Sequence, residues 1–178
     1  MMKKFLQLPL VLILAFVSIS CGYTVSSTLP SRLKTLHVEL FKNSINFGET
    51  NDGHNLYFPM LEVSARNAIV NRFLFDGHLK IVDPDVADLV LKGELKSYNR
   101  QPLRYTENND VLEYRVQVTV ALKMWDAQKQ EPMWEESGFV GEATYFISGA
   151  QATSEESAVN AAVLDLARRI VERTVEYW

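Results

Sequence analysis

The chain has 178 residues, of which 47% are hydrophobic and 22% are charged, proportions typical of an ordinary globular protein. This composition excludes a disordered or fibrous chain. The formal net charge of −4 gives no electrostatic basis for binding nucleic acid, so we expect no nucleic-acid partner. The single cysteine excludes an internal disulfide.

The first twenty residues have the pattern of a secretory signal peptide. Two lysines precede the 13-residue apolar segment Phe5–Val17, which is shorter than the roughly 20 residues that span a bilayer. The segment ends in SISC, which resembles the lipobox of bacterial lipoproteins, whose cysteine is acylated with fatty acids such as palmitate. Ser18 departs from the usual leucine, and a plain signal peptide beside an unrelated cysteine is the alternative. We expect residues 1–20 to be removed and Cys21 to carry lipid.

Removal of residues 1–20 and their two lysines leaves 158 residues with a net charge of −6, enough for one compact domain. Residues 21–33 are small, polar and proline-containing, as in a tether. Gly22 follows the cysteine, where aspartate would retain a lipoprotein at the inner membrane of enteric bacteria, so the resemblance implies the outer membrane. We therefore expect a lipidated tether over 21–33 and a single domain over 34–178.

Hydrophobic periodicity places the first elements of this domain. Alternating residues predict a strand over 35–41, and a segment rich in Gly, Asn and Asp predicts a loop over 43–55. Helical spacing predicts a helix over 59–75 that starts at Pro59. Gly77 is expected to end this helix, and a short strand over 79–82 follows.

The middle of the chain predicts a sheet. Residues 87–100 and 114–124 alternate strictly and should form paired strands, the second half-buried. A turn then leads to a strand over 133–146, in which Gly138 and Gly141 indicate a bulge.

The last element is predicted to be a helix with a capping box formed by Thr153 and Glu156. The elements together predict an α+β fold in the order β-α-β-β-β-α. In this two-layer sandwich, two helices pack on one face of a four-stranded or slightly larger mixed sheet, and the other face is left uncovered.

The sequence carries no legible catalytic set. It has no GxSxG elbow and no glycine-rich phosphate loop, and His37, His54 and His78 are not spaced as metal ligands. We expect no enzymatic activity, no metal and no cofactor. A periplasmic hydrolase with a polar pocket lined by Glu49, Asp52 and His54 is the alternative.

The polar faces of the two best strands are rich in cations. Five basic residues stand against only Glu94 and Glu113: Lys92, Lys96, Arg100, Arg115 and Lys123. This distribution predicts a locally basic sheet face that could receive an anionic ligand, especially if Arg104 lies at the same edge. The alternative is a face whose lysines serve solubility and protect strand edges.

The order of several segments resembles a known family, the lipopolysaccharide-assembly lipoproteins. The similarity runs over nearly the whole mature chain, and its segments are CGY at 21–23, FKN at 41–43, FLFDGHLKIV, ADLVLKGELKSYNR, EYRVQVTVALKMWDAQ and EPMWEES. The resemblance implies a non-enzymatic, lipid-anchored outer-membrane protein with an α/β sandwich fold. Such a protein sits in the lumen of the β-barrel that translocates lipopolysaccharide, assists assembly of that barrel and binds lipopolysaccharide.

Members of this family are thought to contact lipopolysaccharide through basic residues near strand-connecting loops. The resemblance points to Arg100 and Arg104 as candidates, with Lys96 and Arg115 beside them. An outer-membrane lipoprotein that serves another envelope machine, in cell-wall synthesis or secretion, is the alternative.

Overall fold

The computed structural model describes residues 29–45 and 58–176. The predicted signal peptide, the lipidation site Cys21 and most of the tether lie outside these residues. So do Glu49, Asp52 and His54, the lining of the alternative hydrolase pocket.

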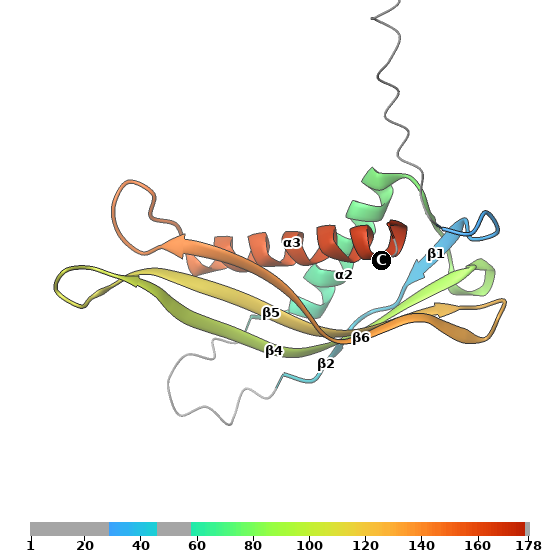
Figure 1. The fold of residues 1–178 in the computed structure, drawn as a ribbon, viewed down its shortest axis with the longest axis horizontal. Coiled ribbons are helices and arrows are strands. Elements are labelled where there is room, and N and C mark those ends of the chain that lie inside the picture. Colours follow the sequence, from blue (N-terminus) through green and yellow to red (C-terminus); the bar gives the residue numbers. More distant parts are fainter. Residues whose placement is uncertain (1–28, 46–57, 177–178) are drawn as a thin grey trace, which may run out of the picture.

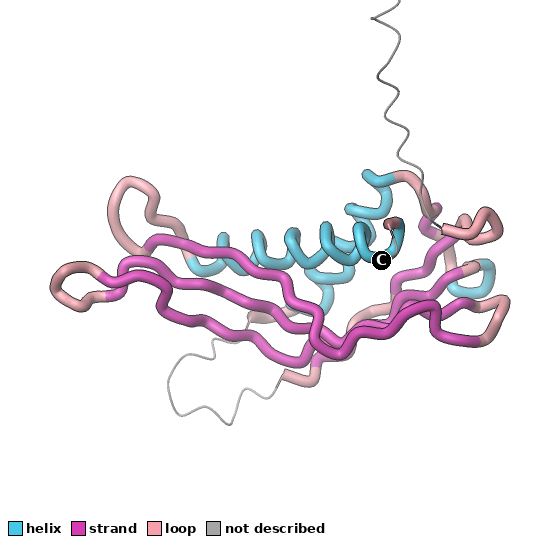
Figure 2. Tube along the Cα trace, viewed as in Figure 1, coloured by secondary structure: helices cyan, strands magenta, loops and turns pink. Residues whose placement is uncertain are grey.

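The domain is a two-layer α+β sandwich, which confirms the predicted fold class (Figures 1 and 2). Both helices lie on one face of a six-stranded mixed sheet, and no described helix covers the other face. The elements in chain order are β1 Thr35–Val38, β2 Lys42–Asn43, α2 Leu61–Asp76, β3 Lys80–Ile81, the 3₁₀ turn η1 Pro84–Val86, β4 Leu89–Tyr105, β5 Val111–Asp126, β6 Glu131–Phe146 and α3 Glu155–Val175.

The strand order is β3-β1-β4-β5-β6, with β2 paired to β4. The short strands β1, β2 and β3 pair in parallel, whereas the long strands β4, β5 and β6 form an antiparallel meander. The two-residue strand β2 overlaps the start of the predicted loop, because two residues are too short to show a period. β4 continues to Tyr105, five residues beyond its predicted end.

The core lies between β5 and the helices. Alternate residues of β5 point toward the helices and are almost fully buried: Val116, Val118, Val120, Leu122 and Met124. They face Ala162, Leu166 and Ile170 of α3, which are fully buried as well. Each such aliphatic side chain contributes about 2 kcal/mol to stability through its burial. The strict alternation read from the sequence therefore identified the covered face of this strand.

The helix ends differ from the predictions by one or two residues. α2 begins at Leu61 because Met60 adopts a left-handed backbone with φ of 59°, so Pro59 is not its first residue. Gly77 ends α2 as predicted, with φ of 81° and its amide donating to the carbonyl of Phe73. The capping box predicted at Thr153 is wrong by one residue.

The N-cap of α3 is Ser154, whose hydroxyl accepts a hydrogen bond from the amide of Ser157 at 3.1 Å. The Ser154 cap therefore stabilises the first turn of α3. The residue three positions after this cap is Ser157, so the predicted glutamate does not take part in a capping box. Asn109 and Gln130 also have positive φ, and both lie in turns of the meander.

α3 packs closely against the outer strand β6. Gly141 lies against the carbonyl oxygen of Ala162 and the side chain of Leu166, so a Cβ at this position would overlap both. Two α3 side chains also bond the free backbone edge of β6: Arg169 donates to the carbonyl of Val140, and Asp165 accepts from the amide of Glu142 at 3.2 Å. The helix thereby protects the middle of an edge strand from pairing with another chain.

The two glycines predicted to form a bulge in β6 have different roles. The register shifts between the pairs formed by Val120 and Leu122, which leaves Ser137 and Gly138 as the bulge. Gly141 pairs regularly with Val118 and permits the close approach of α3 instead.

Candidate functional site

The polar and apolar clusters that could bind a partner lie at the two ends of the elongated sheet. The tether end comprises residues 29–34, β3, η1 and the β5–β6 turn at 127–130. The distal end comprises the β4–β5 turn at 106–110 and the connection from β6 to α3 at 147–154 (Figure 1). β4 runs between them, and its 17 residues span roughly 55 Å.

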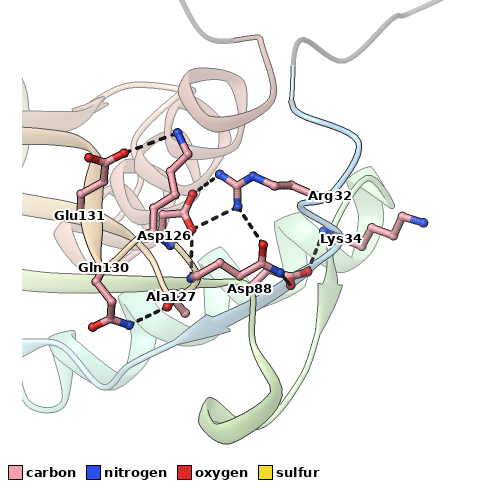
Figure 3. Close-up of polar contacts among 9 residues, drawn as sticks. Arg32, Lys34, Asp88, Asp126, Ala127, Gln130 and Glu131 are labelled. Atoms are coloured by element: carbon pink, nitrogen blue, oxygen red, sulfur yellow. Dashed lines mark hydrogen bonds and ion pairs between the residues drawn. The ribbon is translucent and has the colours of Figure 1, made fainter.

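A cluster of polar contacts fixes the chain where the tether joins the domain (Figure 3). The guanidinium of Arg32 pairs with both carboxylate oxygens of Asp126 at the end of β5. Asp88 accepts hydrogen bonds from the backbone amides of Lys34 and Thr35 at 2.9 and 3.0 Å. Gln128 bridges the two halves by donating to Asp88 at 3.2 Å. We call Arg32, Asp88, Asp126 and Gln128 the tether clamp.

Both carboxylates of the tether clamp are held in their charged form. The hydrogen bond from Arg32 lowers the pKa of Asp126, although its burial opposes the shift. The backbone amide of Lys34 likewise lowers the pKa of Asp88. The start of the domain is therefore attached to the sheet by charged hydrogen bonds as well as by the backbone.

The distal end brings together two loops that are far apart in sequence (Figure 1). The amide of Ile147 donates to the carbonyl of Leu112 at 3.1 Å, and the amide of Thr153 donates to the carbonyl of Phe146 at 2.9 Å. Leu103, Tyr105 and Ile147 expose apolar surface here, with Tyr105 58% exposed. This end is therefore amphipathic, whereas the sequence pattern predicted only its positive charges.

A bulge in β4 changes which side chains reach the uncovered face. Leu95 pairs with Val120, but Ser97 pairs with Thr119, so the alternation shifts by one residue. Tyr98 and Arg100 consequently stand opposite Val118 and Val116 on the covered face. The prediction that Arg100 lies on the uncovered face is wrong for this reason.

Arg100 instead joins a half-buried cluster beneath α3. Its Nη1 donates to Glu155 of α3 at 2.6 Å, and its guanidinium lies 4.8 Å from the ring centroid of Tyr114. Tyr98 and Tyr145 also donate their hydroxyls to the Glu155 carboxylate. Burial and the bond to Glu155 raise the pKa of Tyr98, so this hydroxyl stays protonated. The cluster links β4, β6 and the start of α3.

Arg104 lies beyond the cluster, at the distal end, and its side chain is 64% exposed. Its Nε forms an ion pair with the buried carboxylate of Glu113 at 3.0 Å, and its guanidinium lies 5.8 Å from the ring centroid of Phe146. Arg115 is half-buried two residues along β5 from Glu113, and therefore points to the same face. The arrangement orients an exposed guanidinium beside apolar surface.

Among the residues that the structure describes, the uncovered face is charge-balanced rather than basic, so the predicted excess of cations is not found there. Glu39, which follows β1, and Glu135 of β6 supply negative charges that balance the lysines of β4 and β5. The ion pairs on this face are Lys42–Glu94, Lys92–Glu39, Lys96–Glu94 and Lys123–Glu135, with N–O distances of 3.9, 3.4, 2.9 and 3.1 Å.

Lys96 is thus engaged with Glu94, whose pKa is lowered first by a hydrogen bond from Ser44 and then by Lys96 itself. A shallow hollow of about 300 Å³ on this face is lined by charged side chains of both signs. A face of this kind suits a polar, wet environment better than a purely anionic ligand.

The described histidines have structural partners. Nδ1 of His37 lies 3.0 Å from the carbonyl of Val82, and Nδ1 of His78 lies 2.8 Å from the carboxylate of Asp76.

Over residues 29–45 and 58–176, no group of three or more His, Cys, Asp or Glu side chains could hold a metal ion. Within the same part of the chain, no helix has the length and apolar character needed to cross a membrane.

The sequence profile of the lipopolysaccharide-assembly family, LptE, matches residues 33–175, which covers all of the described elements. The chain belongs to the lipopolysaccharide-assembly family. This membership confirms the resemblance noted from the order of its segments. LptE proteins are components of lipopolysaccharide transport and not enzymes, which agrees with the missing catalytic set.

Solved structures with the same fold come from several bacteria. Protein XCC0632 from Xanthomonas campestris has a TM-score of 0.58 at 10% identity, covering 85% of this chain and 88% of that one. The dodecamer of the L103M variant of PelC from Paraburkholderia phytofirmans has a TM-score of 0.51 at 14% identity, covering 85% of this chain and 96% of that one. Uncharacterized lipoprotein B from Nitrosomonas europaea has a TM-score of 0.50 at 15% identity, covering 88% of this chain and 92% of that one. No curated protein sequence matches the chain.

Proposed function

We propose that this protein is an outer-membrane lipoprotein, anchored through Cys21, that plugs and helps to assemble the lipopolysaccharide translocon barrel and binds lipopolysaccharide. Membership of the lipopolysaccharide-assembly family supports the process, and the signal and lipobox pattern supports the anchor. The barrel and lipopolysaccharide are the two partners, with the membrane reached through the lipid.

The observation that carries the binding role is the position of Arg104. Its exposed guanidinium lies over the ring of Phe146 at the distal end, where Leu103 and Tyr105 also expose apolar surface. Lipopolysaccharide carries phosphates next to acyl chains, so its recognition needs a cation next to apolar surface. An arginine fork binds phosphate through paired charged hydrogen bonds. Arg104 is therefore our first candidate for a lipopolysaccharide contact.

The other candidates from the sequence have different surroundings. Arg115 lies on the same face as Arg104 and is a second candidate for the phosphate contact. Lys96 is paired with Glu94 on the uncovered face. Arg100 is held by Glu155 beneath α3, so we assign it to positioning the distal end rather than to direct contact.

The separation of the two ends suggests an orientation in the barrel. The lipid would hold the tether end close to the membrane surface at the barrel mouth, and the sheet would carry the distal end roughly 55 Å away, along the lumen. The charge-balanced uncovered face matches the polar interior that transmembrane barrels present.

The experiment is affinity purification of the full, acylated chain from outer membranes in mild detergent. We expect one large β-barrel protein to copurify in equal molar amount. A variant with Cys21→Ala is the matched control, because it should lose membrane association while its folded domain is unchanged. Recovery of the lipoprotein without a barrel, or with a cell-wall enzyme or secretin, would contradict the proposal.

A further inference from the structure

Three exposed apolar side chains lie at the tether end, where the proposed function gives them no task. Leu74 and Phe75 lie in the last turn of helix α2, and Phe75 is 82% exposed. Val86 in η1 is 68% exposed. The guanidinium of Arg72 lies 5.5 Å from the centroid of the Phe75 ring, and the rest of this exposed ring is open to contact a further partner. We call these three residues the tether-end patch.

Backbone contacts put the tether-end patch close to the tether itself. Lys80 donates its amide to the carbonyl of Lys34 at 2.9 Å, and only five residue steps lead from Phe75 to Lys80. Phe75 therefore lies within about 20 Å of the first residues of the domain. The carbonyl of Val86 accepts from the hydroxyl of Thr35 at 3.4 Å. Figure 1 shows the C-terminal end of α2 at the same end of the molecule as the first described residues.

The length of the tether limits how far this end can be from the bilayer. Eight residue steps join Cys21 to Leu29. Fully extended they reach about 29 Å, and as a flexible coil their root-mean-square length is about 16 Å. An acylated Cys21 would thus hold the patch at a high effective concentration near the lipid surface, where even a weak apolar contact becomes populated.

We propose that the tether-end patch inserts Leu74, Phe75 and Val86 into the headgroup and upper acyl region of the phospholipid bilayer, as a second membrane contact beside the lipid anchor. The inference rests on the proposed anchor at Cys21. Side chains of Phe, Leu and Val are suited to this depth, and their burial would add an apolar contact to that of the acyl chains. Asp83 and Asp85 lie beside Val86, so the attraction is apolar and does not require anionic lipid.

The experiment measures the depth of single side chains in the bilayer. Cys21 is the only cysteine, and acylation blocks its thiol, so an introduced cysteine can be spin-labelled selectively. Labels at Phe75→Cys and Val86→Cys are compared with Leu164→Cys, on the exposed surface of α3, in the acylated full chain reconstituted into phosphatidylcholine vesicles. Collision with oxygen and with a water-soluble nickel complex reports depth.

We expect the labels at 75 and 86 to collide at least threefold less with the nickel complex than the label at 164 does in the same vesicles. Equal access of nickel at 75, 86 and 164 in vesicles would overturn the proposal. So would protection that appears only when the copurified barrel is added, because the occupant would then be protein.

Vesicle flotation separates this inference from the proposed anchor. If the chain does not float, the anchor proposal fails. If it floats and the labels remain in water, only the second contact fails. Unfolding midpoints in urea equal to that of the parent chain show that the labelled variants remain folded.

Discussion

Arg100 of β4 and Glu155 of α3 are 55 residues apart in sequence, yet their side chains meet at 2.6 Å in a half-buried ion pair. The contact depends on the bulge between Leu95 and Ser97, which turns Arg100 from the uncovered face to the covered one. The same carboxylate receives the hydroxyls of Tyr98 and Tyr145. One glutamate at the start of α3 thereby fixes the helix to two strands.

Arg100→Ala should lower the free energy of unfolding by about 2 kcal/mol, because it leaves the Glu155 carboxylate without its charged donor in a half-buried site. Urea unfolding measures the change. Lys92→Ala is the control and should change stability by less than about 1 kcal/mol, because Lys92 and its partner Glu39 are both exposed. Equal losses in the two variants would contradict the positioning role of Arg100.

The bulge explains why the sequence predicted the fold better than the candidate site. Alternation over β5 identified the covered face correctly, because β5 lies between β4 and β6 and the side chains of α3 pack on one of its faces. In β4 the pattern predicts one continuous alternation, and no residue signals that Lys96 and Ser97 together oppose Thr119. From Ser97 to Arg100, each side chain therefore points to the face opposite to the one that the alternation predicts.

The predicted basic face was wrong for a related reason. Counting charges on two strands omits the neighbours that pairing brings to them. Glu39 follows β1 and pairs with Lys92, whereas Glu135 of β6 pairs with Lys123. These are long-range contacts, fixed by the strand order, which the sequence did not provide. Arg104 was identified through the family resemblance and through its predicted place in the loop after residue 100, although β4 extends through this position.

Gly141→Val should destabilise the domain by about 2–3 kcal/mol. A Cβ at this position overlaps the carbonyl of Ala162, which is helix backbone and cannot move without shifting α3. Gly138→Ala is the control, since a Cβ there meets nothing within 4 Å and its backbone has no positive φ, so the change should stay within about 0.5 kcal/mol. Thermal or urea unfolding of both variants tests the close approach of α3, which a tolerated valine would contradict.

Acid should weaken the tether clamp. The pKa values of Asp126 and Asp88 are lower in the folded protein than the roughly 3.9 of an unfolded chain. Their contribution is therefore fully present above about pH 5 and is lost as the pH falls through the folded pKa values. Unfolding in urea at pH 6 and pH 3.5 should show a fall in stability. In Asp126→Asn the fall should be smaller, and stability at pH 6 should already be about 1–2 kcal/mol lower. An identical pH dependence in the two proteins would show that the Asp126 carboxylate does not carry this effect.

Arg104→Glu should weaken lipopolysaccharide binding about tenfold, because it removes one charged donor and adds a like charge next to the ligand's phosphates. Binding of purified lipopolysaccharide to the full chain, followed by titration at two salt concentrations, measures the loss and its electrostatic part. Lys92→Glu reverses the same charge on the uncovered face, where Lys92 pairs with Glu39, and should leave binding unchanged. Arg100→Glu is a poor test, because Arg100 is needed for the packing of α3. If both reversals weaken binding equally, overall charge is responsible and Arg104 has no special role; if neither does, the ligand contacts another part of the chain.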